Sequence, residues 1–111
     1  MEAKRRITKG KRAEVQPLVE KVVRVVREQV ANEGLRIFLF GSWAEGRALA
    51  VSDLDIGLDA GEAKASAPVA RILDWLAVLP TLRKIDLIDV RSVNQEFRGR
   101  VLEHGELIFG K

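Results

Sequence analysis

The sequence predicts a single α/β domain of the α+β kind, in which helices pack on one small mixed β-sheet. The chain has 111 residues, which is the length of one small domain. Its apolar residues recur at helical spacing in some segments and at strand spacing in others, and these segments alternate along the chain. With 47% hydrophobic and 32% charged residues, the composition is that of a globular protein.

An amphipathic helix is expected from Val15, and Gly34 is its stop signal. Its apolar stripe consists of Val15, Leu18, Val19, Val22, Val23, Val26 and Val30. Residues 35–40 are then apolar on both faces apart from Arg36, which indicates a strand covered on both sides. Residues 41–52 are small and polar, so we expect a loop there.

Residues 53–59 alternate strictly between polar and apolar positions, which predicts a strand with one acidic face. Its apolar face holds Leu54, Ile56 and Leu58, and its other face holds Asp53, Asp55, Gly57 and Asp59. After a linker at 60–67, a helix opened by Pro68 is expected to end at Pro80. The core face of that helix would be Val69, Ile72, Leu73 and Leu76.

Residues 85–90 predict a further strand. Ser92 and Gln95 have the spacing of a capping box, which favours a last helix that Gly105 closes. Residues 107–109 would form a short terminal strand that pairs with the sheet.

The positive charge is concentrated at the N-terminus. Residues 1–12 hold six basic side chains against one acidic one, whereas the other 99 residues hold 13 basic and 15 acidic groups. We therefore divide the chain into a flexible basic tail, residues 1–12, and a folded domain, residues 13–111. Such a tail can contact phosphate or an acidic partner, although terminal charge runs are more often simply solvated.

Several classes of protein are excluded by composition. The chain has no cysteine, so it can form neither a disulfide framework nor a thiolate metal site. Its longest apolar runs fall far short of the roughly 20 residues of a membrane helix, and no apolar segment of a secretory signal follows the basic start. The expected location is the cytoplasm, with no membrane partner.

The segment with the most chemical information is Gly41-Ser42, followed after ten residues by Asp53-Leu54-Asp55. Two carboxylates at i and i+2 lie on one face of a strand, about 6.6 Å apart along the backbone, so both can reach one cation. Magnesium prefers such oxygen ligands together with substrate phosphates. Gly41 lets the backbone approach a phosphate, and Ser42 can donate its hydroxyl and amide to that anion.

This combined pattern resembles the signature of the DNA polymerase beta-like nucleotidyltransferase superfamily, and its smallest branch, the minimal nucleotidyltransferases, has about this length. The resemblance runs from about residue 15 to 110 and includes the Ile85-Asp86-Leu87-Ile88-Asp89 segment. It implies a nucleotidyltransferase fold and an enzyme that moves a nucleoside monophosphate, with ATP as the expected donor and two Mg²⁺ ions as cofactors.

The resemblance also implies roles for individual residues. Asp53, Asp55 and a third acid on a neighbouring strand would hold the metals and carry catalysis, and that third acid would accept the proton of the acceptor hydroxyl. Asp86 and Asp89 both fit its flanking pattern but point to opposite faces, and we choose Asp86, which comes earlier in its strand. The nucleotide-binding residues would be Gly41, Ser42, Arg47 and Ser52.

One position departs from the family pattern. The family commonly reads Ala-Arg-Gly after Gly-Ser, whereas this chain reads Ala44-Glu45-Gly46, so a phosphate-binding arginine is missing there. Arg47 could supply that charge, or it could be an ordinary surface arginine. His104 is expected at a helix end, where a cation-capable side chain favours the dipole. Trp43 could stack on a base, but a tryptophan beside a tight turn more often packs within its own domain, and Trp75 is either half-buried or part of a partner surface.

The acceptor is not visible in the sequence, because the chain is too short for a second domain that would hold it. By resemblance, minimal nucleotidyltransferases pair with small helical partners of the HEPN type in toxin and antitoxin complexes, so AMP transfer to a partner protein is the leading expectation. A homo-oligomer, a small-molecule acceptor, a nucleic acid end and a non-catalytic partner-binding module remain the alternatives.

Overall fold

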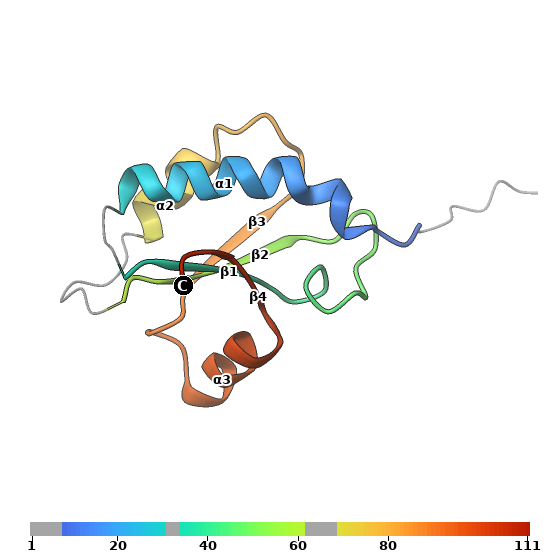
Figure 1. Cartoon of the computed structure of the whole chain (residues 1–111). Coiled ribbons are helices and arrows are strands. Elements are labelled where there is room, and N and C mark those ends of the chain that lie inside the picture. The colour runs from blue at the N-terminus through green and yellow to red at the C-terminus, as the bar shows by residue number, and fades with distance from the viewer. Residues whose placement is uncertain (1–7, 31–33, 62–68) are drawn as a thin grey trace, which may run out of the picture.

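The computed structural model describes residues 8–30, 34–61 and 69–111. One four-stranded sheet, in the order β3-β2-β1-β4, carries α1 and α2 on one face and α3 on the other (Figure 1). The elements are the 3-10 helix η1 Arg12–Val15, α1 Gln16–Gln29, β1 Arg36–Phe40, β2 Leu54–Asp59, α2 Val69–Leu76, β3 Ile85–Asp89, α3 Gln95–His104 and β4 Glu106–Phe109. The predicted fold class is confirmed.

The main core lies between the sheet and helices α1 and α2. Val19, Val22 and Val26 of α1 are buried there, as the helical spacing of the valines predicts. The predicted apolar face of β2, Leu54, Ile56 and Leu58, is completely buried against them. Burying such side chains contributes about 1.5–3 kcal/mol each, so this face fixes the orientation of β2 and leaves its acidic residues on the other side.

The opposite face of the sheet is covered in part by α3. Phe38, Val90 and Val101 form a second, smaller cluster there, with Phe40 and Ile88 packed against it. Gly57 lies beneath α3, and a Cβ at this position would come within 2.9 Å of Val90. The small residue therefore permits the close packing of this face.

The register of the sheet brings three strands together on the face of α3. β1 pairs antiparallel with β2, so Phe40 lies opposite Asp55. β2 pairs parallel with β3, so Asp55 lies beside Asp86. Paired residues of neighbouring strands project to the same side of a sheet, and these three side chains therefore share one face.

Three details differ from the sequence predictions. Asn94, not Ser92, caps α3, because its side-chain oxygen accepts the Phe97 N–H at 2.8 Å directly before the first helical residue. Helix α2 ends at Leu76 rather than at Pro80, since its last bonds tighten into i to i+3 turns such as Leu79 N–H to Leu76 O. Leu73 of α2 is exposed rather than part of the core.

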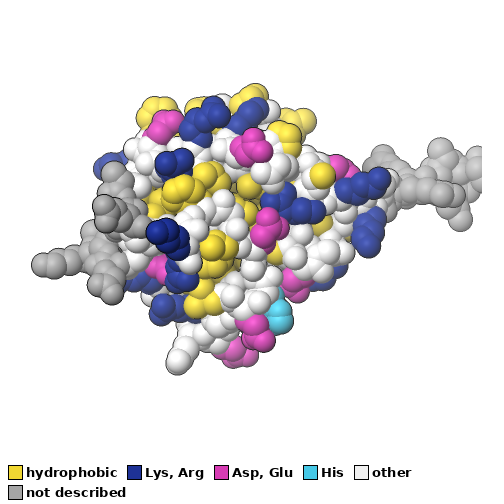
Figure 2. All heavy atoms as spheres, viewed as in Figure 1, with side chains coloured by type: hydrophobic (Ala, Val, Ile, Leu, Met, Phe, Trp, Pro, Cys, Tyr) yellow, Lys and Arg dark blue, Asp and Glu magenta, His cyan; other side chains and the backbone are white. Residues whose placement is uncertain are grey.

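Residues 8–12, which we assigned to the basic tail, contact the folded domain. The Gly10 N–H donates to Ala48 O, and the Ala50 N–H donates to Thr8 O. Arg12 makes a bidentate pair with Glu106 of β4 at 2.8 and 2.9 Å. In Figure 2, Lys and Arg side chains are spread over the visible face and are also present at this end of the molecule. Residues 1–7 of the tail, together with Pro68 and most of the expected linker, lie outside the described residues.

Within the described part of the chain, no helix combines the length and the apolar character that crossing a membrane requires.

Candidate active site

The centre of the candidate site is the carboxylate pair of Asp55 and Asp86. Both residues are half-buried, and they occupy paired positions on the parallel strands β2 and β3. Lys84 lies at the rim of the pair, with its Nζ 3.6 Å from Asp86 Oδ1. The register of β2 and β3 therefore places two of the three acids that the resemblance implies, Asp55 and Asp86, side by side.

The electrostatic environment of Asp55 disfavours its ionised form. Burial, the negative charge of Asp86, a side-chain hydrogen bond with Asp86 and the charge of Asp53 together raise the pKa of Asp55 to about 6, against the smaller opposing effect of Arg47. Two carboxyl groups that are hydrogen-bonded to each other resist simultaneous ionisation unless a cation lies between them. The pair is thus suited to share either a proton or a metal ion.

Asp53 lies just before β2 and is exposed, so it contributes through its charge more than through direct contact. In residues 8–30, 34–61 and 69–111, no three Asp, Glu or His side chains already form a metal-binding arrangement. Magnesium usually takes one or two protein carboxylates and completes its shell with water and phosphate oxygens. The chemistry of the Asp55 and Asp86 pair fits that requirement.

Asp89, the alternative third acid, lies away from this pair. Its position opposite Leu58 puts it on the face of α1 and α2, three residues after Asp86. Asp89 is buried, and its Oδ1 accepts the Arg91 N–H at 2.9 Å. Of the two candidates, the sheet places Asp86 beside Asp55 and uses Asp89 in the turn after β3.

The backbone at Gly41 brings the loop against the carboxylates. Gly41 has a φ of 73°, in the left-handed region, and a Cβ built on it would lie 2.3 Å from Asp55 Oδ2. The Gly41 carbonyl then accepts the N–H groups of Ala44 and Glu45 in a tight turn. Ser42, half-buried, follows Gly41 in this turn.

Ser52, the other serine of the predicted nucleotide-binding set, is used within the loop. Its Oγ accepts the Leu49 N–H at 2.9 Å. Its carbonyl accepts Trp43 Nε1–H at 3.1 Å and Arg83 at 2.7 Å, while the Arg83 guanidinium lies 5.0 Å from the Trp43 ring. Trp43 is buried, as expected for a structural residue. These bonds anchor the end of the loop to the segment before β3.

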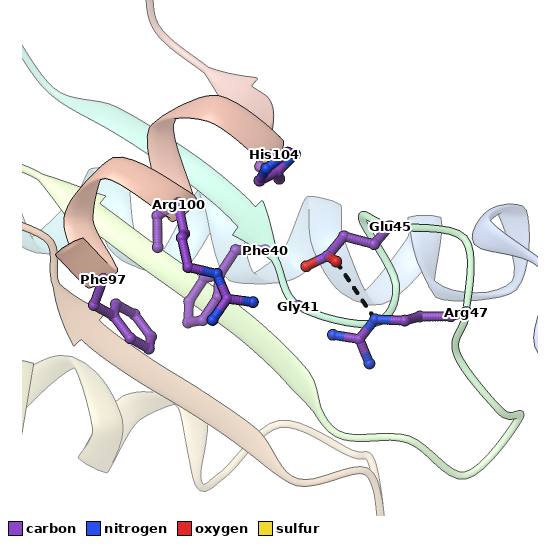
Figure 3. Close-up of a pocket in the computed structure, with 9 residues that line it drawn as sticks. Phe40, Gly41, Glu45, Arg47, Phe97, Arg100 and His104 are labelled. Atoms are coloured by element: carbon purple, nitrogen blue, oxygen red, sulfur yellow. Dashed lines mark hydrogen bonds and ion pairs between the residues drawn. The ribbon is translucent and has the colours of Figure 1, made fainter.

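A pocket of about 160 Å³ opens beside Gly41. Glu45 and Arg47 form one wall and are linked by a 3.4 Å contact between Arg47 Nε and Glu45 Oε1 (Figure 3). The remaining walls come from β1 and α3 and include Phe40, Phe97, Arg100, Val101, His104 and Gly105.

The residues of α3 in this pocket were missed by sequence reasoning, and His104 was assigned only to the helix end. Phe97, Arg100 and His104 recur at spacings of three and four, so they share one face of a helix, and that signal was present in the sequence. The sequence does not tell which face of α3 lies toward the site. Packing of Val101 onto Phe38 and Val90 decides it.

A family model described as polymerase beta, nucleotidyltransferase matches residues 20–111. Among curated proteins, none matches the chain. The fold is also similar to solved structures of toxin–antitoxin complexes. One complex with AMP-PNP has a TM-score of 0.64 at 25% identity, over 83% of this chain and 73% of that chain.

Two further complexes share the fold. A variant of the MntA–HepT toxin–antitoxin complex, with two aspartates separated by one residue changed to glutamate, has a TM-score of 0.65 at 24% identity, over 83% of this chain and 73% of that one. A complex of a tri-AMPylated HEPN toxin of Shewanella oneidensis with MNT antitoxin has a TM-score of 0.62 at 24% identity, over 86% of this chain and 72% of that chain.

Proposed function

Since this chain belongs to the polymerase beta nucleotidyltransferase family, we propose that it transfers AMP from ATP to a hydroxyl group of a HEPN-type partner protein. The observation that carries the proposal is the pairing of Asp55 with Asp86 on parallel strands, directly beside the left-handed turn at Gly41. This arrangement joins carboxylates for a cation and backbone for a phosphate in one place.

Asp55 and Asp86 would hold magnesium, with Asp53 adding negative charge from the end of the loop. Bound magnesium would neutralise charge on the phosphate oxygens and orient them. Gly41 and Ser42 would receive the phosphate at the turn, beside the Asp55 carboxylate, which comes close to Gly41 because Gly41 has no Cβ.

In the proposed reaction, an oxygen of the acceptor hydroxyl forms a bond to the α-phosphorus of ATP. The bond from that phosphorus to the β-phosphate oxygen breaks, and pyrophosphate leaves. Asp86 accepts the proton of the hydroxyl, since it lies on β3, the edge strand of the sheet, where an acceptor can reach it. The products are an AMP ester of the acceptor and pyrophosphate.

A protein acceptor is supported by the size of the site and by the relatives. Small-molecule sites commonly measure about 300–1,000 Å³, and the pocket beside Gly41 is only about 160 Å³, so this domain encloses a nucleotide incompletely. A relative of the same fold is found in complex with an AMPylated HEPN toxin, and another complex holds AMP-PNP. A partner protein would supply both the missing wall and the hydroxyl.

Thermal unfolding tests the nucleotide site. Magnesium with ATP should raise the Tm of the purified chain, because a ligand that binds only the folded state stabilises it by mass action. Asp55→Asn should remove the magnesium-dependent part of that increase, and Asp53→Asn should reduce it. Equal stabilisation with and without magnesium, in the parent and both variants, would show that the carboxylates do not form the metal site.

Labelled ATP tests the transfer. The chain alone should transfer AMP poorly, because positioning of the acceptor supplies much of the rate of phosphoryl transfer. Addition of a helical HEPN-type protein should place label on that protein, and Ser42→Ala or Asp55→Asn should stop the labelling. Rapid labelling of a small molecule or an RNA end by the chain alone would refute the protein acceptor and leave the enzyme class intact.

A further inference from the structure

The pocket beside Gly41 has two arginines on opposite sides. Arg47 comes from the loop before β2, and Arg100 comes from α3 (Figure 3). In Figure 3 the guanidinium groups of Arg100 and Arg47 lie on either side of Gly41, with the Glu45 carboxylate near Arg47. Glu45 offsets the charge of one of the two arginines, so the walls of the pocket keep a positive charge that favours an anionic ligand.

Arg100 differs from the other arginines around the site. Arg83 donates to the Ser52 carbonyl, and Arg47 contacts Glu45. Within the described segments, Arg100 has neither a hydrogen bond nor an ion pair, and its side chain is exposed. A structural role therefore does not account for its direction, which leaves its five N–H donors available to a ligand.

Gly41 links the pocket to the carboxylates, because it lines the pocket and a Cβ built on it would lie 2.3 Å from Asp55 Oδ2. A triphosphate whose reacting phosphate lies at Asp55 and Asp86 would extend its remaining phosphates over Gly41. Planar guanidinium groups bind such phosphates in a bidentate manner.

We infer that Arg100 of α3, together with Arg47, binds the β- and γ-phosphates of ATP, the part that leaves as pyrophosphate. The inference rests on the proposed function and names a residue of the donor site beyond the Gly41-Ser42 turn. In the loop, Glu45 offsets the positive charge of Arg47, and Arg100 adds a second positive charge from α3. The apolar surface of Phe40 and Phe97 then lies beside the phosphates.

The test is a titration of the purified full chain with ATP, ADP and AMP in the presence of magnesium. Arg100→Ala should weaken ATP binding about tenfold, which is the usual scale for a lost charge-assisted bond, and should change AMP binding less than twofold. Arg98→Ala is the matched control, because Arg98 is an exposed arginine of the same helix outside this pocket. It should change ATP binding less than twofold.

A second variant tests whether a positive charge from another wall of the pocket can replace that of Arg100. Glu45→Arg, introduced into the Arg100→Ala chain, puts a cation back on the pocket wall and should restore most of the ATP affinity. Equal loss for AMP and ATP would place Arg100 against the AMP part of the nucleotide and overturn the inference, as would equal effects of Arg100→Ala and Arg98→Ala. If the parent chain does not bind ATP in the presence of magnesium, the proposed function fails as well. If the parent chain binds ATP and Arg100→Ala binds it equally well, only this inference is refuted.

Discussion

Replacing Gly41 by alanine, with Gly46→Ala as a control, distinguishes the cost of the backbone conformation from the effect of moving the Asp55 carboxylate. Gly41 and Gly46 have almost the same backbone angle, with φ of 73° and 74°. An alanine in this left-handed region costs roughly 1–2 kcal/mol. The surroundings differ, because a Cβ at Gly46 meets nothing within 4 Å, whereas a Cβ at Gly41 meets Asp55 Oδ2 at 2.3 Å.

The two variants should therefore lose about the same stability but differ in function. The atom that the new Cβ of Gly41→Ala meets is the end of a flexible side chain, so Asp55 can rotate away at little further cost. Each variant should unfold roughly 4–10 °C below the parent. Only Gly41→Ala should lose magnesium-dependent ATP binding, since its Asp55 carboxylate is displaced from Asp86.

Chemical denaturation measures the first quantity, and the increase in Tm with ATP and magnesium measures the second. Gly46→Ala corrects for the shared backbone cost and for any general loosening of the loop. If Gly41→Ala keeps its magnesium-dependent stabilisation, or if Gly46→Ala loses it to the same degree, the contact between Gly41 and Asp55 does not control the site.

Three further predictions follow from the acids of the sheet. Asp86→Asn should abolish transfer with little change in stability, whereas buried Asp89→Asn should mainly lower the free energy of unfolding; reversed effects in labelling and denaturation would give Asp89 the catalytic role. Asp55→Asn should raise the free energy of unfolding at pH 7 without magnesium, because burial and Asp86 oppose the charge of a group whose pKa is about 6, and no increase would contradict that repulsion. Asp59 is hydrogen-bonded to Arg36 at 2.6 Å and to the Gly61 N–H; these contacts and the charges of Arg36 and Arg98 outweigh burial and lower its pKa. The stabilisation from ionised Asp59 should be complete above its ordinary pKa of 3.8 and should disappear as pH falls through the lower pKa of the folded protein. The difference in the free energy of unfolding between the parent and Asp59→Asn should therefore shrink on acidification. A difference that stays constant with pH would refute the pairing.

The elements and the enzyme class could be predicted from the sequence because each depends on a local pattern. The valines of α1 and the alternation of β2 give the covered faces directly, and both predictions are confirmed. The nucleotidyltransferase class is confirmed by the family match. The roles of Asp53, Asp55, Asp86 and the nucleotide-binding residues stay predictions.

What the sequence could not provide depends on contacts between distant segments. Alternation puts Asp86 and Asp89 on opposite faces, but only the parallel register shows which one adjoins Asp55. Ser92 and Asn94 are both good capping residues, so only the start of α3 distinguishes them. Leu73 matches the apolar period of α2, but α2 is short and only Ile72 and Leu76 reach the core.

The two tryptophans have opposite environments, which gives the chain a built-in optical probe. Trp43 is buried in the loop and lies so close to Gly10 that a Cβ there would meet its ring at 2.4 Å, whereas Trp75 on α2 is about half exposed. With Trp75→Phe, the remaining indole emission would come from the loop alone. Because indole emission shifts with solvent exposure, its wavelength would report, in real time, whether the N-terminal segment and Arg83 still hold the loop closed while a nucleotide arrives.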